Sequence, residues 1–311
     1  MTVAAVVVSY NRKDLLEKCL AALEGQTRPL DEIIVIDNSS TDGAPELVRE
    51  LFPRVKLFDT GSNVGGAGGF AWGVELAIAH GHEYAWLMDD DAEPELDALE
   101  PLVELAGTAS EPYSFLASMV TMGGNTINTG NPPVFSNDIN RQVSANVKGA
   151  IAIDAATFVG VLVNLEIARQ THLPQRDFFI WVDDTEYTLR LSRIAPAVMV
   201  RESRIKHPLS KSGSNDMGWR LFYFLRNKLW LIRTDPQMSL QRKAFEVLGY
   251  VGVALLQGPH AEDKKLWVRS IARGAYQGIF KSARKETPGT LLDELSPRER
   301  AAALELKNMN V

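Results

Sequence analysis

The strongest constraint on the fold of this chain is the alternation of strand-like and helix-like segments along its first hundred residues. Runs rich in Val and Ile are separated by stretches whose apolar residues recur with helical spacing. We predict strands at residues 3–8, 32–36, 55–58 and 84–88, and helices at residues 14–23, 45–51 and 70–79. Because this rhythm builds sheets from parallel strands, it predicts an α/β fold with a mostly parallel, Rossmann-like sheet flanked by helices.

Three of the predicted strands end in polar residues. In a parallel sheet the carboxyl ends of the strands meet at one edge, and ligands bind beyond that edge. We therefore expect one site to be formed by the residues that follow the first, second and fourth strands: Tyr10, Asn11 and Arg12; Asp37 and Asn38; Asp89, Asp90 and Asp91.

The three consecutive aspartates are a candidate platform for a metal ion and a diphosphate. Carboxylates packed at a strand end repel one another unless a cation neutralises them. Oxygen ligands select Mg²⁺ or Mn²⁺, which often complete their coordination with substrate phosphates. A solvated acidic turn is the alternative, but the position of Asp89 directly after the apolar residues 86–88 favours the metal.

The residues after the first two strands could bind a nucleotide base. Tyr10 and Arg12 can stack on a flat ring, and Asp37 can accept a hydrogen bond from a ring N–H. A surface aromatic and a charge at a helix N-terminus explain Tyr10 and Arg12 equally well.

A glycine-rich segment, residues 63–70, lies between the third strand and the next helix. Glycines let the backbone approach a ligand closely, so Asn63, Gly65, Gly66 and Gly69 are candidate donor contacts. A plain tight turn is an equally good interpretation. The segment is not a dinucleotide fingerprint, because two βα units precede it.

A second acidic cluster, Asp183, Asp184 and Glu186, follows the apolar residues 178–181. Neighbouring carboxylates raise one another's pKa, which suits one of them to act as a general base. A capping or surface acidic turn is the alternative. His207 stands alone in the sequence, and an isolated histidine is more often structural than a metal ligand.

Charge is distributed unevenly along the 311 residues, whose net charge is −6. Residues 1–200 hold 13 Lys and Arg against 28 Asp and Glu, whereas residues 201–285 hold 17 against 6. The acidic part argues against binding of nucleic acid, and the basic part predicts contact with an anionic partner.

The basic part begins, after a polar hinge at residues 209–218, with the aromatic and basic segment 219–233. We predict that this helix lies in a membrane interface and that residues 219–285 contact an anionic membrane surface. A core helix packed on the catalytic domain is the alternative. The longest apolar stretch, residues 247–256, is shorter than the ~20 residues of a spanning helix, and no signal peptide is expected.

Taken in order over residues 3–207, these motifs resemble the family 2 inverting glycosyltransferases with the GT-A fold, and residues 36–43 are the most specific match. By this resemblance Asp89 would contact the nucleotide sugar or the metal, Asp91 would bind metal and diphosphate, and His207 would be a late metal ligand. Asp184 would be the catalytic base. The cofactor would be Mg²⁺ or Mn²⁺.

The resemblance also implies a domain plan and two sets of binding residues. A catalytic domain would span residues 1–208, with a donor half at about 1–110 and an acceptor half at about 111–208, followed by a helical, basic region at 209–311. The donor set would be Tyr10, Asn11, Arg12, Asp37, Asn38, Asn63, Gly65, Gly66, Gly69, Asp89 and Asp90, and the acceptor set Trp181, Asp183 and Glu186.

Within the family, residues 63–70, 86–91 and 183–187 resemble the galactofuranosyltransferases of actinobacterial cell-wall galactan assembly, and the chain length is similar to that of the initiating enzyme. That resemblance implies UDP-galactofuranose as donor and a polyprenyl-diphosphate-linked glycan as acceptor. It also implies a cytoplasmic enzyme peripheral to the inner face of the plasma membrane.

Two features depart from this subfamily. Val182 separates Trp181 from the acidic pair, and residues 222–227 are similar to a stretch of related rhamnosyltransferases. A rhamnosyltransferase that uses dTDP-rhamnose is therefore an alternative. A non-catalytic protein that binds sugar nucleotides or lipid-linked glycans is an alternative of another class, and a nucleotidyltransferase is disfavoured because no basic loop follows the first strand.

Overall fold

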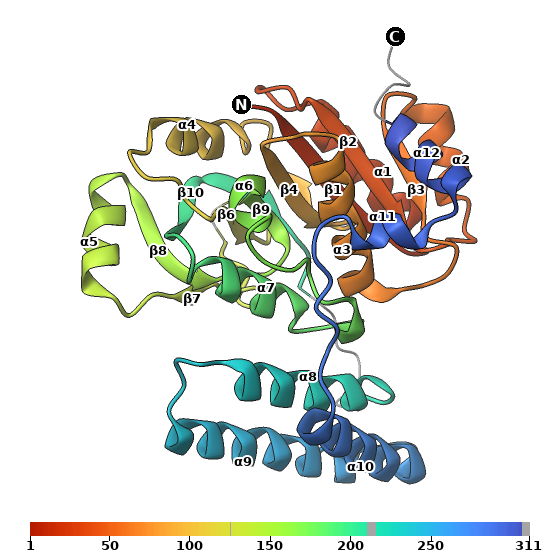
Figure 1. Ribbon diagram of the computed structural model, residues 1–311, viewed down its shortest axis with the longest axis vertical. Coiled ribbons are helices and arrows are strands. Elements are labelled where there is room, and N and C mark those ends of the chain that lie inside the picture. The colour runs from red at the N-terminus through yellow and green to blue at the C-terminus, as the bar shows by residue number, and fades with distance from the viewer. Residues whose placement is uncertain (125, 210–215, 307–311) are drawn as a thin grey trace.

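The computed structural model describes residues 1–124, 126–209 and 216–306, and Figure 1 shows their arrangement. A ten-stranded sheet forms the centre of the molecule, with strand order β3-β2-β1-β4-β9-β6-β10-β8-β7 and with β5 paired to β10. Helices cover the sheet, and a separate helical layer lies below it in the view of Figure 1.

The first half of the sheet is parallel, as the alternating pattern predicts. Its strands are β1 (Val3–Ser9), β2 (Glu32–Asp37), β3 (Lys56–Asp59) and β4 (Tyr84–Asp89). β1 pairs in parallel with β2 and β4, and β2 pairs in parallel with β3. The four predicted strands are confirmed to within one residue at each end.

Helices cover both faces of this half. Alternate residues of β1 pack on opposite sides, one set with α1 (Lys13–Glu24) and α2 (Ala44–Leu51) and the other set with α3 (Gly65–Ala79). Every residue of β1 and β2 is buried. Burial on both faces explains why these strands are continuously apolar rather than alternating.

The predicted start of α3 is wrong, because the helix begins at Gly65 instead of residue 70 and includes most of the glycine run. A Cβ added at Gly69 would lie 2.4 Å from Val8 Cγ1, and one added at Gly73 would lie 2.1 Å from Val6 Cγ1. These glycines therefore let α3 lie closer to β1 than any side chain would allow.

The second half of the sheet contains both parallel and antiparallel strands. The sequence predicted a mostly parallel sheet and did not predict these antiparallel pairs. β6 (Phe115–Thr121) and β10 (Ala197–Lys206) pair in parallel, β9 (Val159–Asn164) pairs antiparallel with β4 and β6, and β8 (Ala150–Ala155) pairs antiparallel with β10. The other elements here are β5 (Glu93–Pro94), α4 (Glu100–Thr108), β7 (Val134–Phe135), α5 (Ile139–Val147), α6 (Leu165–Ala168), η1 (Arg176–Phe178) and α7 (Asp183–Leu191).

The helical layer consists of α8 (Arg220–Thr234), α9 (Leu240–Leu256), η2 (Gly258–His260) and α10 (Lys264–Phe280). In Figure 1, α8 lies between the sheet and the pair α9 and α10. The buried residues of α8 include Leu225, Asn227 and Trp230, so its burial supports the core-helix interpretation. Residues 210–215 of the predicted hinge lie outside the described residues. No helix in the described parts of the chain is both long and apolar enough to cross a membrane.

After α10 the chain returns to the sheet domain. Residues 281–294, the return segment, end in α11 (Thr290–Glu294), and α12 (Pro297–Glu305) follows. Leu291, Leu292 and Ala303 join the core on the α3 side of the sheet. Ser296 and Glu299 form a capping box at the start of α12. The domain boundary at residue 208 stays a prediction, and α11 and α12 belong to the core of the sheet domain.

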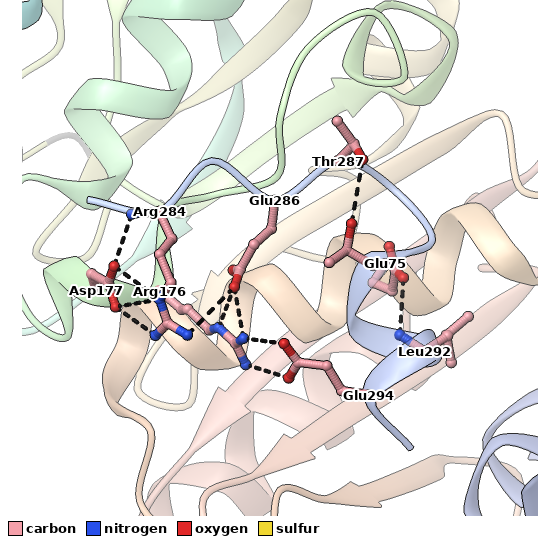
Figure 2. A network of polar contacts seen from close by, with 9 residues as sticks. Glu75, Arg176, Asp177, Arg284, Glu286, Thr287, Leu292 and Glu294 are labelled. Carbon is pink, nitrogen blue, oxygen red and sulfur yellow. Dashed lines mark hydrogen bonds and ion pairs between the residues drawn. The ribbon is translucent and has the colours of Figure 1, made fainter. Parts of the chain in front are cut away.

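Figure 2 shows the contacts that hold the return segment. Arg176 donates to Glu286 at 2.8 Å and to Glu294 at 2.9 Å, and Arg284 donates to Asp177 at 2.6 Å. The buried carboxylate of Glu75 in α3 accepts from the backbone N–H groups of Gly289 and Leu292. The return segment is therefore fixed both to η1 and to α3.

Candidate active site

The polar residues predicted after β1 and β4 meet at the carboxyl edge of the sheet, and β10 brings His207 to the same edge. Asp89, Asp91 and His207 each offer a ligand atom, and these atoms all lie within 4.8 Å of one another. Nε2 of His207 lies 3.0 Å from Oδ1 of Asp91. Two strands more than one hundred residues apart in the sequence thus supply one cluster.

Arg12 supplies positive charge to this cluster from the end of β1. Its Nη1 lies 2.8 Å from Oδ2 of Asp91 and 3.3 Å from Oδ1 of Asp90. The backbone N–H of Tyr10 donates to Oδ2 of Asp90 at 3.3 Å. Asp90 is buried, and both Asp90 and Asp91 tie the end of β4 to the end of β1.

Burial and mutual repulsion shift the pKa of the aspartates. Burial raises the pKa of Asp89 well above its usual range, and the charges of Asp91 and Asp90 raise it further. Burial raises the pKa of Asp90 to about 6, although Arg12 opposes this shift. For Asp91, burial is outweighed by the hydrogen bond and charge of His207, which lower its pKa.

The donor set fits a divalent cation. Two carboxylate oxygens and one imidazole nitrogen can bind Mg²⁺ or Mn²⁺, and such an ion would add positive charge beside Asp89, whose pKa the neighbouring carboxylates raise. The cluster of Asp89, Asp91 and His207 is therefore a candidate metal site.

The end of β2 carries the predicted base-binding residues. Asp37 is buried; its Oδ2 accepts from the N–H of Ser40 at 2.9 Å, whereas its Oδ1 accepts from none of the described residues. Oδ1 of Asn11 accepts from the N–H of Thr41 at 2.7 Å, which ties the ends of β1 and β2 together. Tyr10 is 44% exposed, so an accessible ring and an unpartnered acceptor lie on adjacent strand ends.

Asn38 and Asn63 hold the start of α3. Nδ2 of Asn38 donates to the carbonyl oxygen of Gly65 at 3.2 Å, and Oδ1 of Asn63 accepts from the N–H of Gly65 at 2.9 Å. Both asparagines therefore have a structural role, and their contact with a donor stays a prediction.

The predicted donor glycines differ in their surroundings. Gly65 has a φ of +74°, and a Cβ there would lie 2.1 Å from the carbonyl oxygen of Phe179. Gly69 packs against β1, whereas a Cβ at Gly66 would meet nothing within 4 Å among the described residues. Packing explains two of the glycines, and Gly66 alone faces open space.

The second acidic cluster begins α7. Burial, followed by the charge of Asp184, raises the pKa of Asp183 to about 8. Burial also raises the pKa of Asp184, which accepts from the hydroxyl of Thr185 at 3.1 Å, while the charge of Lys228 lowers it. The charge of Asp183 contributes to the raised pKa of Asp89, so the start of α7 lies near the aspartates that follow β4.

The other predicted acceptor residues lie beside this pair. The carboxylate of Glu186 forms an ion pair with Arg190 at 2.9 Å and accepts from Gln175 at 3.3 Å, so it is already neutralised. Trp181 is 38% exposed and is free to contact a ligand.

Sequence reasoning missed the contribution of α8 to this site. Asn227 donates to backbone carbonyl groups of the loop before α7, Arg226 contacts the same loop, and Lys228 places its charge near Asp184. Arg226 and Asn227 are a polar pair within a helix of mostly aromatic and aliphatic residues, and this pattern could have indicated their role.

Solved structures with the same fold are glycosyltransferases. The chain superposes on S. aureus TarS 1-349 in complex with UDP with a TM-score of 0.58 at 12% identity, covering 100% of this chain and 88% of that one. GalNAc-T7 with UDP, GalNAc and Mn²⁺ gives a TM-score of 0.62 at 16% identity, covering 89% of this chain and 57% of that one. The fold is therefore the GT-A fold.

Residues 4–161 match the model of glycosyl transferase family 2, and the chain belongs to this family. It is therefore a glycosyltransferase, as the motifs predict. Galactofuranosyltransferase GlfT1 of Mycobacterium tuberculosis (strain ATCC 25618 / H37Rv) is 47% identical over 94 residues, which are 29% of this chain and 30% of the relative.

The N-acetylglucosaminyl-diphospho-decaprenol L-rhamnosyltransferase of the same strain is 35% identical over 92 residues, 30% of this chain and 28% of the relative. The chain thus aligns with less than a third of the length of either relative.

Proposed function

We propose that this glycosyltransferase is a metal-dependent, inverting enzyme that transfers galactofuranose from UDP-galactofuranose to a polyprenyl-diphosphate-linked glycan in cell-wall or surface polysaccharide assembly. The observation that carries the proposal is the cluster of Asp89, Asp91 and His207, whose ligand atoms all lie within 4.8 Å of one another. The start of α7 lies close enough for the charge of Asp183 to raise the pKa of Asp89. The likeness to GlfT1 over its aligned third supports galactofuranose as the sugar.

Asp89, Asp91 and His207 would hold the cation, either Mg²⁺ or Mn²⁺. When bound, such an ion neutralises negative charge that develops on the departing diphosphate. Arg12, which already lies against Asp91, would add a second positive charge beside the diphosphate. Mn²⁺ is present in the GalNAc-T7 structure and supports this assignment.

The donor nucleotide would lie across the ends of β1 and β2. The exposed ring of Tyr10 can stack on uracil, and the unpartnered Oδ1 of Asp37 can accept the ring N–H. The open space at Gly66 leaves room for the diphosphate or sugar near the N-terminus of α3.

Asp184 would act as the general base. It takes the proton of an acceptor hydroxyl while the hydroxyl oxygen forms a bond to the anomeric carbon. The bond from that carbon to the diphosphate oxygen breaks, and UDP leaves with the bonding electrons. Because attack occurs opposite the leaving group, the anomeric centre is inverted. The raised pKa of Asp184 strengthens it as a base.

The acceptor's lipid would be met by α9 and α10 rather than by α8. Exposed large apolar residues on these two helices are Leu240, Phe245, Leu248, Val253, Leu255, Leu256, Val268, Tyr276, Ile279 and Phe280. Phe245, Leu248 and Leu255 share one face of α9, and α10 carries basic residues from Lys264 to Arg273. An apolar face with adjacent basic charge supports peripheral contact with an anionic membrane.

A donor screen tests the enzyme proposal. The protein is incubated with UDP-galactofuranose or dTDP-rhamnose and a synthetic polyprenyl-diphosphate-linked glycan, in Mn²⁺, Mg²⁺ or EDTA. We expect transfer from UDP-galactofuranose that EDTA abolishes and added Mn²⁺ or Mg²⁺ restores. Transfer from dTDP-rhamnose but not from UDP-galactofuranose would identify dTDP-rhamnose as the donor instead. Undiminished turnover in EDTA would exclude metal dependence.

A further inference from the structure

The loop between η1 and α7 has an unusual backbone. Phe179, Trp181 and Val182 have φ angles of 63°, 66° and 74°, in the left-handed region that residues with bulky side chains rarely adopt. Such a conformation persists only where surrounding contacts hold it. Because Asp183 and Asp184 follow directly, this loop determines where the proposed base lies.

Asn227 of α8 holds the middle of this loop. Its side chain is fully buried, and its Nδ2 donates to the carbonyl oxygens of Phe178 at 3.0 Å, Ile180 at 2.9 Å and Trp181 at 3.0 Å. Oδ1 of Asn227 in turn accepts from Nε of Arg226 at 3.0 Å. The two N–H bonds of this amide are thus shared among three carbonyl oxygens, one at the end of η1 and two in the loop that follows it.

The start of the loop is fixed by other contacts. Arg226 donates to the carbonyl oxygen of Phe178 at 3.3 Å. The N–H of Ala67 donates to the carbonyl oxygen of Phe179 at 3.3 Å. On the opposite side, Arg176 and Asp177 of η1 bind the return segment, as Figure 2 shows. Asn227 reaches further along the loop, to Trp181, two residues before α7 begins.

We propose that Asn227 is a positioning residue, which holds the left-handed loop at residues 179–182 so that α7 presents Asp184 to the acceptor hydroxyl. The inference rests on the proposed role of Asp184. It extends that role by making the helical layer part of the catalytic arrangement, since α8 supplies the group that fixes the loop. Removal of the Asn227 amide frees the loop carbonyls without altering any donor contact at β1, β2 or β4.

The test compares Asn227→Ala and the milder Asn227→Ser with Asn164→Ala. Asn164 is a buried asparagine at the end of β9, at the sheet edge opposite the site, so it controls for loss of a buried amide. The measurements are UDP affinity, kcat and KM for transfer, and hydrogen–deuterium exchange of peptides that cover residues 176–186.

We expect faster exchange of these peptides and a kcat about 10²-fold lower in both Asn227 variants, with UDP affinity unchanged, because a misplacement of about 1 Å costs this much. Asn164→Ala should change thermal stability but neither the loop exchange nor kcat. Loop exchange equal to wild type in Asn227→Ser, or an equal kcat loss in Asn164→Ala, would overturn the proposal.

The exchange measurement also separates this inference from the proposed function. If wild-type protein transfers no sugar in the donor screen while Asn227→Ser loosens the loop, the proposed substrates fail and the loop contact stands. If transfer is found and Asn227→Ser leaves both kcat and loop exchange unchanged, the positioning role fails and the proposed function stands.

Discussion

The side chain of Asp184 is half-buried at the start of α7, where burial raises its pKa and Lys228 opposes that shift. We expect Asp184→Asn to lower kcat by ~10²–10⁴, because removal of a positioned base typically costs this much. UDP affinity should be nearly unchanged, since the proposed nucleotide contacts lie on β1 and β2. Steady-state transfer kinetics and calorimetric UDP titration measure the two effects.

Asp154→Asn is the matched control for this prediction. Asp154 lies on β8 and forms a surface ion pair with Arg141 at 3.7 Å. The control should retain wild-type kcat. Substantial kcat in Asp184→Asn, or a parallel loss of UDP binding, would remove Asp184 from the role of base.

At the scale of single residues, the sequence indicated the candidate metal ligands. It did not indicate the residues that hold the proposed catalytic side chains in place. Asp89 and Asp91 were recognisable because consecutive acids after an apolar strand need a cation. His207 was ambiguous until β10 placed its ring against Asp91. Asn227 was missed because its partners lie 46 to 49 residues away in the sequence, and no local pattern encodes that contact.

At the scale of elements, the contact between α3 and β1 depends on glycine. We expect Gly73→Ala to lower the free energy of unfolding by ~1–3 kcal/mol, because its Cβ would lie 2.1 Å from Val6 Cγ1 and overpack the core. Urea unfolding measures the change.

Gly252→Ala in α9 provides the comparison, since a Cβ there meets nothing within 4 Å among the described residues. Because both changes replace a helical glycine, both gain about 0.5–1 kcal/mol in helix propensity. Equal stability of the two variants would contradict the close packing of α3 on β1.

A second element-scale feature predicts pH dependence. Burial alone would raise the pKa of Glu32, but hydrogen bonds from His80 at 2.7 Å and His82 at 2.9 Å lower it to about 2. A carboxyl group with a lowered pKa in the folded state stabilises the fold above its unfolded pKa of about 4.3 and ceases to do so as the pH falls toward 2.

We therefore expect wild type to lose its stability advantage over Glu32→Gln between about pH 4.5 and about pH 2. Urea midpoints across this range measure it, with Glu17→Gln as the variant of an exposed carboxyl group. A constant difference between wild type and Glu32→Gln at every pH would show that Glu32 does not titrate with the fold.

The elements of the first half of the sheet were predictable because strand and helix alternate with strong apolar periodicity. The start of α3 was not, since Gly65 to Gly69 have low helix propensity and only contact with β1 and Phe179 explains them. The mixed second half was also missed, because the antiparallel insertion of β9 between β4 and β6 is a tertiary arrangement.

At the scale of the whole molecule, the exposed apolar face of α9 and α10 predicts membrane contact. We expect the double variant Phe245→Glu/Leu248→Glu to lose binding to anionic liposomes, because it removes apolar area and adds negative charge. Co-sedimentation at low and raised salt measures binding.

Leu51→Glu is the control for this change. Leu51 is 56% exposed on α2, in the sheet domain and outside the helical layer. It should leave liposome binding intact. Wild-type protein that stays in the supernatant at low salt would exclude the membrane proposal.

The helical layer is attached to the sheet domain at both of its ends, and this limits how it can move. An appendage joined through a single connection can swivel about it, but this layer starts after β10 and is bound again to α3 through Glu75. Rotation about one attachment would pull against the other. We therefore expect the apolar face of α9 to keep a constant orientation relative to the start of α7, so an acceptor glycan anchored in a lipid surface would approach Asp184 from one direction.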